Sequence, residues 1–135
     1  MMHIQVPYDV EVKPWAAILS TMPDAQPQKL SFLTYATATW LDDERAWIND
    51  DGKQSVVKLR RWGKVIDAFE KTKPGQWISM DDEDYGTLKR IVESPKKVFT
   101  QAPTQIALAA IPFVDAVLEA KHELPAILDG KAATA

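Results

Sequence analysis

Polar and apolar residues alternate strictly near the start of the chain, where every second residue from Ile4 to Val12 is apolar. This period of two predicts a half-buried β-strand over residues 4–12. Pro7 has no N–H to donate to a neighbouring strand, so we expect an edge strand or a bend at this residue. Pro14 then suits the first position of a short helix in the sequence WAAILS.

Three later segments have helical periodicity. The first is predicted over residues 57–72, where apolar residues share one face and Lys73-Pro74-Gly75 ends the helix. Its apolar stripe consists of Leu59, Trp62, Val65, Ile66 and Phe69. After an extended piece at Trp77 and Ile78, a second helix carries Tyr85, Leu88, Ile91 and Val92 and stops at Ser94-Pro95. A third is expected over residues 104–121, kinked or split at Pro112.

Two segments between these patterns are less clear. Residues 29–41 have a helical stripe, but their threonine and tyrosine content suits a strand, and we favour the helix. Asp51-Gly52 lies between short apolar flanks and predicts a small hairpin. Together the elements predict an α+β fold, with three or four helices on a small, mainly antiparallel sheet. We expect one domain over residues 1–128 and a frayed tail over residues 129–135.

Composition places the chain among ordinary globular proteins, with 46% hydrophobic and 26% charged residues. The net charge of -3 creates no strong field toward nucleic acid or a membrane. There is no cysteine, and the longest apolar stretch, residues 106–114, is too short to cross a bilayer. The N-terminus also lacks the pattern of a signal peptide. We therefore expect a soluble, cytoplasmic protein without disulfides or membrane contact.

Four consecutive acidic residues, 81–84, form the densest ionisable cluster. Acids in the first turn of a helix are stabilised by the helix dipole, and Ser79 followed by Asp82 fits a capping signature. A metal site needs ligands that converge, which consecutive helical residues rarely do alone. We therefore interpret the cluster as a helix start. The turn at residues 49–52 lacks the ligand spacing of a calcium loop.

Signatures of catalysis are absent from the sequence. His3 and His122 are isolated, and no nucleophile elbow or phosphate-binding glycine loop occurs. We expect no catalytic residues, no metal and no cofactor, although an enzyme assembled from distant carboxylates stays open.

Two groups of residues are candidates for binding. Arg60, Arg61 and Lys64 share the predicted outer face of the helix over residues 57–72 and could contact phosphates; the alternative is a solvated face. Trp40, Trp47, Phe113 and Val117 are candidates for a protein interface, because large apolar side chains anchor such contacts. The alternative for each is core packing.

Residues 59–95 join a helix containing VIDAF to a PG turn, an extended piece and an acidic-capped helix containing DEDYGTLKRIV. This order resembles small proteins of unassigned activity that tailed bacteriophages and prophages encode, often near virion-assembly genes. The resemblance implies an interaction protein in assembly or a virion accessory protein, located in the host cell cytoplasm or in the virion, and it nominates no catalytic residue. We expect a non-enzymatic module that binds a protein partner or itself, with a regulator that contacts nucleic acid or a host protein through its basic helix as the alternative.

Overall fold

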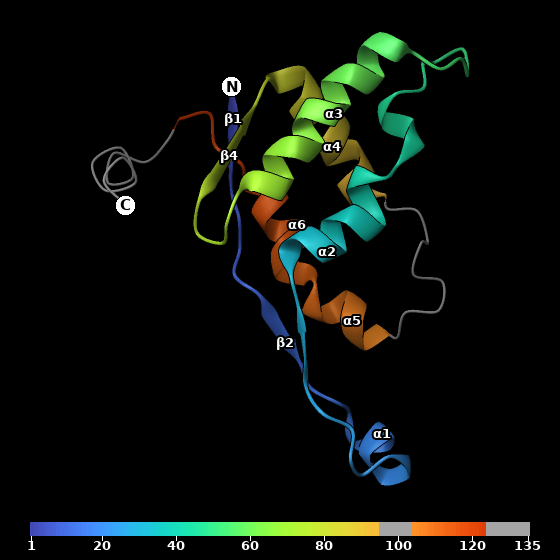
Figure 1. The fold of residues 1–135 in the computed structure, drawn as a ribbon, viewed down its shortest axis with the longest axis vertical. Coiled ribbons are helices and arrows are strands. Elements are labelled where there is room, and N and C mark those ends of the chain that lie inside the picture. The colour runs from blue at the N-terminus through green and yellow to red at the C-terminus, as the bar shows by residue number, and fades with distance from the viewer. Residues whose placement is uncertain (95–103, 124–135) are drawn as a thin grey trace.

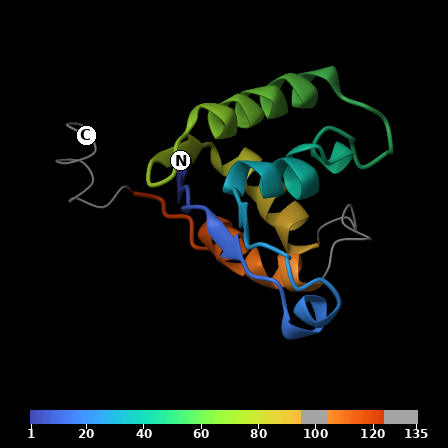
Figure 2. The same cartoon turned by 60° about the horizontal axis from the view of Figure 1, so that its bottom comes forward.

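The computed structural model describes residues 1–94 and 104–123, and these form an α+β fold with two small antiparallel sheets. A body contains most of the helices and one sheet, and an arm with the other sheet projects from it (Figures 1 and 2). The longer helices of the body are α3 (Val56–Lys71), α4 (Asp82–Glu93) and α6 (Ile111–Leu118). The predicted fold class is thus confirmed, whereas the predicted tail lies outside the described residues.

The sheet of the body joins the start of the chain to a strand far along it. β1 (Met2–Gln5) pairs antiparallel with β4 (Trp77–Met80), so that Ile4 lies opposite Ile78. Alternate side chains of a strand point to one face. The side chains of Met2, Ile4, Ile78 and Met80 are accordingly buried in the core.

The predicted strand over residues 4–12 is divided in two. β1 ends at Gln5, and β2 (Val10–Val12) belongs to the other sheet, where it pairs antiparallel with β3 (Gln28–Leu30). The break includes Pro7, whose missing N–H prevents continuous pairing. The expectation of one continuous strand is therefore corrected, whereas the expected bend is observed.

The ambiguous segment contains both kinds of structure. Its first residues lie in β3, and α2 (Phe32–Ala36) continues into a π-helical turn, Thr37–Leu41. The hydroxyl of Ser31 begins the helix by accepting a hydrogen bond from the Thr34 N–H at 3.1 Å. The favoured helix is confirmed from Phe32 onward. The expected hairpin after it reduces to one bridge, between Ile48 and Gln54.

The C-terminal helical segment is split near the predicted proline. α5 (Thr104–Ala109) and α6 are separate helices, and Pro112 lies in the first turn of α6. At that position the missing proline N–H costs no helical hydrogen bond. The Tyr85 hydroxyl of α4 donates to the Val117 carbonyl oxygen of α6 at 2.8 Å.

Phe32 lies at the centre of an aromatic core. Its ring stacks on Phe69 at 5.5 Å between centroids and meets Trp40 and Phe113 edge to face, at 5.7 and 5.6 Å. Trp62 of α3 packs nearby and donates its indole N–H to the Leu41 carbonyl oxygen at 2.9 Å. Of the predicted α3 stripe, only Leu59 is exposed, because it lies in the first turn, before the helix reaches the core.

The arm runs from the body to the short helix α1 (Ala16–Thr21) at its far end (Figure 1). β2 and β3 form its two-stranded ribbon, and β2 also packs against α5. No residue from Pro7 to Ser31 is buried. The arm is thus ordered secondary structure without a core of its own.

Candidate functional site

Three of the four predicted interface residues are core residues. Trp40, Phe113 and Val117 are each 0% exposed, and Trp47 is half-buried against the core. Such side chains cannot anchor a partner on the surface, so that expectation is corrected for Trp40, Phe113 and Val117. Their apolar character reflected packing, which was the alternative for each.

The acidic run 81–84 opens α4, as predicted. Asp81 is the N-cap, and its carboxylate accepts a hydrogen bond from the Asp84 N–H at 2.8 Å. That hydrogen bond is the main reason why the pKa of Asp81 is lowered. Ser79, the residue expected to cap the helix, instead lies in β4.

Arg61 neutralises much of this acidic cluster. Its guanidinium lies 3.2 Å from Asp81, 3.1 Å from Glu83 and 3.0 Å from Asp84. The hydrogen bond to Glu83 is the main cause that raises the pKa of Arg61, whereas burial is the main cause that raises the pKa of Asp84. This network ties α3 to the start of α4.

The predicted basic face consequently loses one of its three members. Arg60 and Lys64 remain exposed on α3, and neither forms an ion pair within residues 1–94 and 104–123. A surface with two free cations has a weaker field than the sequence suggested.

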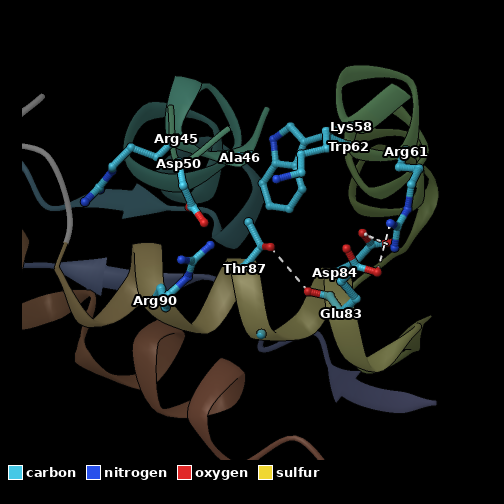
Figure 3. Close-up of a pocket in the computed structure, with 11 residues that line it drawn as sticks. Arg45, Ala46, Asp50, Lys58, Arg61, Trp62, Glu83, Asp84, Thr87 and Arg90 are labelled. Atoms are coloured by element: carbon cyan, nitrogen blue, oxygen red, sulfur yellow. Dashed lines mark hydrogen bonds and ion pairs between the residues drawn. The ribbon is translucent and has the colours of Figure 1, made fainter. Parts of the chain in front are cut away.

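A polar cleft of about 430 Å³ lies between α3, α4 and the segment that carries Asp50. Figure 3 shows Arg90 and Asp50 pointing toward one another across it. Cationic and acidic side chains nearly balance around the cleft, so it has no strong preference for a charged ligand. The Thr87 hydroxyl at its wall donates to the Glu83 carbonyl oxygen at 3.2 Å, and no base activates it among the lining residues described.

Arg45, which lines the cleft, is partly exposed and forms an ion pair with a buried carboxylate. Asp43, whose side chain is 1% exposed, accepts a hydrogen bond from the Arg45 guanidinium at 2.7 Å. Arg45 also donates to the Ser94 carbonyl oxygen at 2.8 Å, and the hydrogen bond to Asp43 raises its pKa. The pair therefore joins the short 3₁₀ turn Glu44–Ala46 to the end of α4.

His3 has a partner that the sequence did not reveal. Its Nδ1 lies 2.7 Å from the Ser79 hydroxyl, on the paired strands β1 and β4. The β1 backbone at His3 also exchanges two hydrogen bonds with Lys121. Ser79 is exposed and His3 is partly buried, and neither residue lines the polar cleft beside α3 and α4.

The far end of the arm carries an apolar surface that the sequence analysis missed, which we call the arm tip: Trp15, Leu19 and Met22. Their side chains are 47%, 39% and 61% exposed, and α1 buries no residue at all. A short helix with unburied apolar side chains is typical of a binding element. The flanking prolines, Pro14 and Pro23, were the one available signal of a separate element.

A second groove lies where the arm leaves the body, beside Tyr8, Trp77 and Pro112, and has a volume of about 450 Å³. The Trp77 indole nitrogen is buried and has no hydrogen-bond partner among the described residues. Asp115, in α6, and Glu119, at the C-terminal end of α6, line the same groove.

Comparison of the chain with family models, with curated proteins and with solved structures finds no match. In the described part of the chain, no group of three or more histidine or acidic side chains is arranged to hold a metal ion. None of the described helices has both the length and the apolar character needed to span a bilayer.

Proposed function

We propose that this protein is a non-enzymatic protein-interaction module that docks its arm tip onto another protein. The proposal depends on one observation about the arm. Its backbone forms ordered strands and a helix, yet none of its residues from Pro7 to Ser31 is buried. Ordering a chain costs conformational entropy that burial normally offsets. A partner that covers Trp15, Leu19 and Met22 would supply that burial.

Trp15, the N-cap residue of α1, favours an arm tip that binds a protein over one that only contacts water. Indole side chains bury a large area at low entropic cost, and they dominate the affinity of many interfaces. Leu19 and Met22 lie near Trp15 in sequence and are also exposed. The expected binding site on the partner is an apolar groove that accepts a short helix.

The biological setting of this module is inferred from the resemblance of residues 59–95 to small phage and prophage proteins. We propose a role in virion assembly or as a virion accessory protein, in which a projecting arm joins one component to the next. The proposal about the arm tip does not depend on this setting.

The test is a pull-down from the source cells with the wild-type chain and two matched variants. One variant carries Trp15→Asp and Leu19→Asp on the arm tip, and the other carries Arg60→Asp and Lys64→Asp on α3. We expect the arm-tip variant to lose the partner and the α3 variant to retain it. The opposite pattern would overturn the proposal.

The nucleic-acid alternative is supported only by Arg60 and Lys64, which are exposed about one helical turn apart. A protein that neutralises two phosphates loses affinity with a logarithmic salt slope of about -2. Binding to a DNA or RNA fragment at two salt concentrations tests this. No affinity at low salt would end the alternative.

A further inference from the structure

The ribbon of the arm has an unpaired strand edge. β2 and β3 pair only with each other within the described residues, so each strand has one edge without a neighbouring strand. Figure 1 shows β3 on one side of β2 and no other element along the opposite side. Isolated two-stranded ribbons are marginally stable in water, and exposed edges readily accept another strand.

The two faces of β2 differ in character. Val10 and Val12 are half-buried, and β2 packs against α5. Glu11 and Lys13, which alternate with them, are exposed. An added strand would therefore extend a ribbon that already has one covered face and one charged face.

Charge complementarity identifies a second copy of this chain as the partner for that edge. If two β2 strands pair antiparallel about a two-fold axis at Val12, each Glu11 lies opposite Lys13 of the other copy. The arrangement repeats by symmetry, so both pairs are attractive. Centring the axis on Glu11 instead would set two carboxylates against each other, and this selects the register at Val12.

The edge of β3 offers no such pairing. Its residues, Gln28, Lys29 and Leu30, include one cation and no acid. Lys29 already lies opposite Glu11 within the ribbon. In the four-stranded sheet formed through β2, the exposed charges of one row would alternate as Lys29, Glu11 and then Lys13 of the second copy.

We propose that the protein forms a two-fold symmetric dimer by antiparallel pairing of β2 with β2 of a second copy, centred on Val12. This contact uses the ribbon edge rather than the arm tip, so it does not rest on the docking proposed above. A dimer would place two arm tips at the ends of one continuous sheet.

Charge exchange provides the first test. Glu11→Lys and Lys13→Glu each place like charges opposite each other in a homodimer, so each should weaken self-association by roughly tenfold or more. An equimolar mixture of the two variants restores both attractive pairs between the copies and should dimerise more strongly than either variant alone. Sedimentation velocity at low salt measures all three samples, with Lys53→Glu on an exposed loop as the matched control.

A single cysteine provides the second test, because the chain contains no natural cysteine. Val12→Cys places the two thiols directly opposite each other across the axis, within reach of a disulfide, and should give a covalent dimer on mild oxidation. Val10→Cys lies opposite Pro14 of the other copy and should not. Equal cross-linking of the two variants would contradict the proposed register.

Three outcomes would overturn the proposal. The wild type could remain monomeric at high concentration, or it could dimerise equally well with either charge variant. In the third outcome, a different protein covers the ribbon edge. The chain would then be monomeric by itself, and its Val12→Cys variant would cross-link to that protein and not to a second copy. The arm-tip proposal would survive each of these results.

Discussion

The body and the arm both contain large apolar side chains but use them differently. In the body, apolar side chains from both sheet strands and from the helices converge on the aromatic cluster around Phe32. In the arm, Trp15, Leu19 and Met22 remain exposed, and no side chain from Pro7 to Ser31 is buried. The same residue types therefore stabilise the fold in one region and are available for binding in the other.

Under the proposed function, this difference separates residues that stabilise the fold from residues that bind a partner. Substitutions in the body should alter the free energy of unfolding, whereas substitutions in the arm should alter association and leave the isolated fold nearly unchanged.

Phe113→Ala should have the largest effect. Its ring is fully buried and contacts Phe32 and Tyr35, and removal of a buried aromatic ring costs about 3–5 kcal/mol of unfolding free energy. Denaturation with urea measures the change. A loss below about 1 kcal/mol would mean that α6 is not a member of the core.

Arg45→Ala should have the next largest effect. It removes the guanidinium that pairs with the buried carboxylate of Asp43 and that holds the Ser94 carbonyl oxygen. Weakening the hydrogen bonding of a buried charged group costs about 1–3 kcal/mol. The matched control is Arg90→Ala, because Arg90 lines the same cleft without an ion pair among the described residues. Thermal unfolding measures both variants, and the control should change little.

Asp81→Ala should cost about 1 kcal/mol, the usual loss when an N-cap is removed. Asp81→Asn keeps an acceptor oxygen and should cost less, because mainly the charge near the helix dipole and Arg61 is lost. Equal losses for the two variants in urea denaturation would show that the hydrogen bond to the Asp84 N–H is unimportant.

The wild type and Asp81→Asn should also differ in pH dependence. The pKa of Asp81 is lower in the folded chain than in the unfolded chain because the ionised carboxylate accepts the Asp84 N–H. Its stabilising contribution is therefore complete above the unfolded pKa of about 4 and is lost as the pH falls through the lower folded pKa. The stability difference between wild type and Asp81→Asn should shrink over that acidic range. A stability difference that grows on acidification would contradict a lowered pKa for Asp81 in the folded chain.

Trp15→Ala should have the smallest effect on stability, within about 0.5 kcal/mol, because its side chain covers no core residue. The same substitution should reduce partner binding strongly. Urea denaturation measures the change in unfolding free energy, and a binding assay on the same sample measures the change in affinity for the partner. A loss of stability similar to that of Phe113→Ala would remove the distinction between arm and body.

Local sequence patterns predicted most helices of the body. The stripe from Trp62 to Phe69 has helical spacing, and the boundaries at Lys73-Pro74-Gly75 and Ser94-Pro95 follow from proline and glycine chemistry. The acidic start of α4 was predicted for the same reason, since capping depends on neighbours in sequence. The prediction that Ser79 caps this helix was wrong, because Ser79 pairs with β1 as part of β4 and Asp81 is the N-cap.

Long-range features could not be predicted in this way. The alternating pattern of residues 4–12 is equally compatible with one strand and with two strands in different sheets, because period alone does not identify the pairing partner. Trp40 and Trp15 look alike in sequence, yet one lies at the core and the other at the arm tip. Arg61 likewise differs from Arg60 only in facing the carboxylates at the start of α4.

Hydrogen exchange at several protein concentrations measures separately how firmly the arm and the body are folded. In dilute solution, the amides of residues 10–30 should exchange through low-cost local opening, whereas those of α3 and α4 should exchange only on global unfolding. Raising the concentration should increase the protection of β2. Amides of α3 and α4 should gain at most the same factor, because dimerisation also opposes global unfolding. Arm amides that are protected as strongly as α3 in the dilute monomer would contradict the claim that the arm lacks a core of its own.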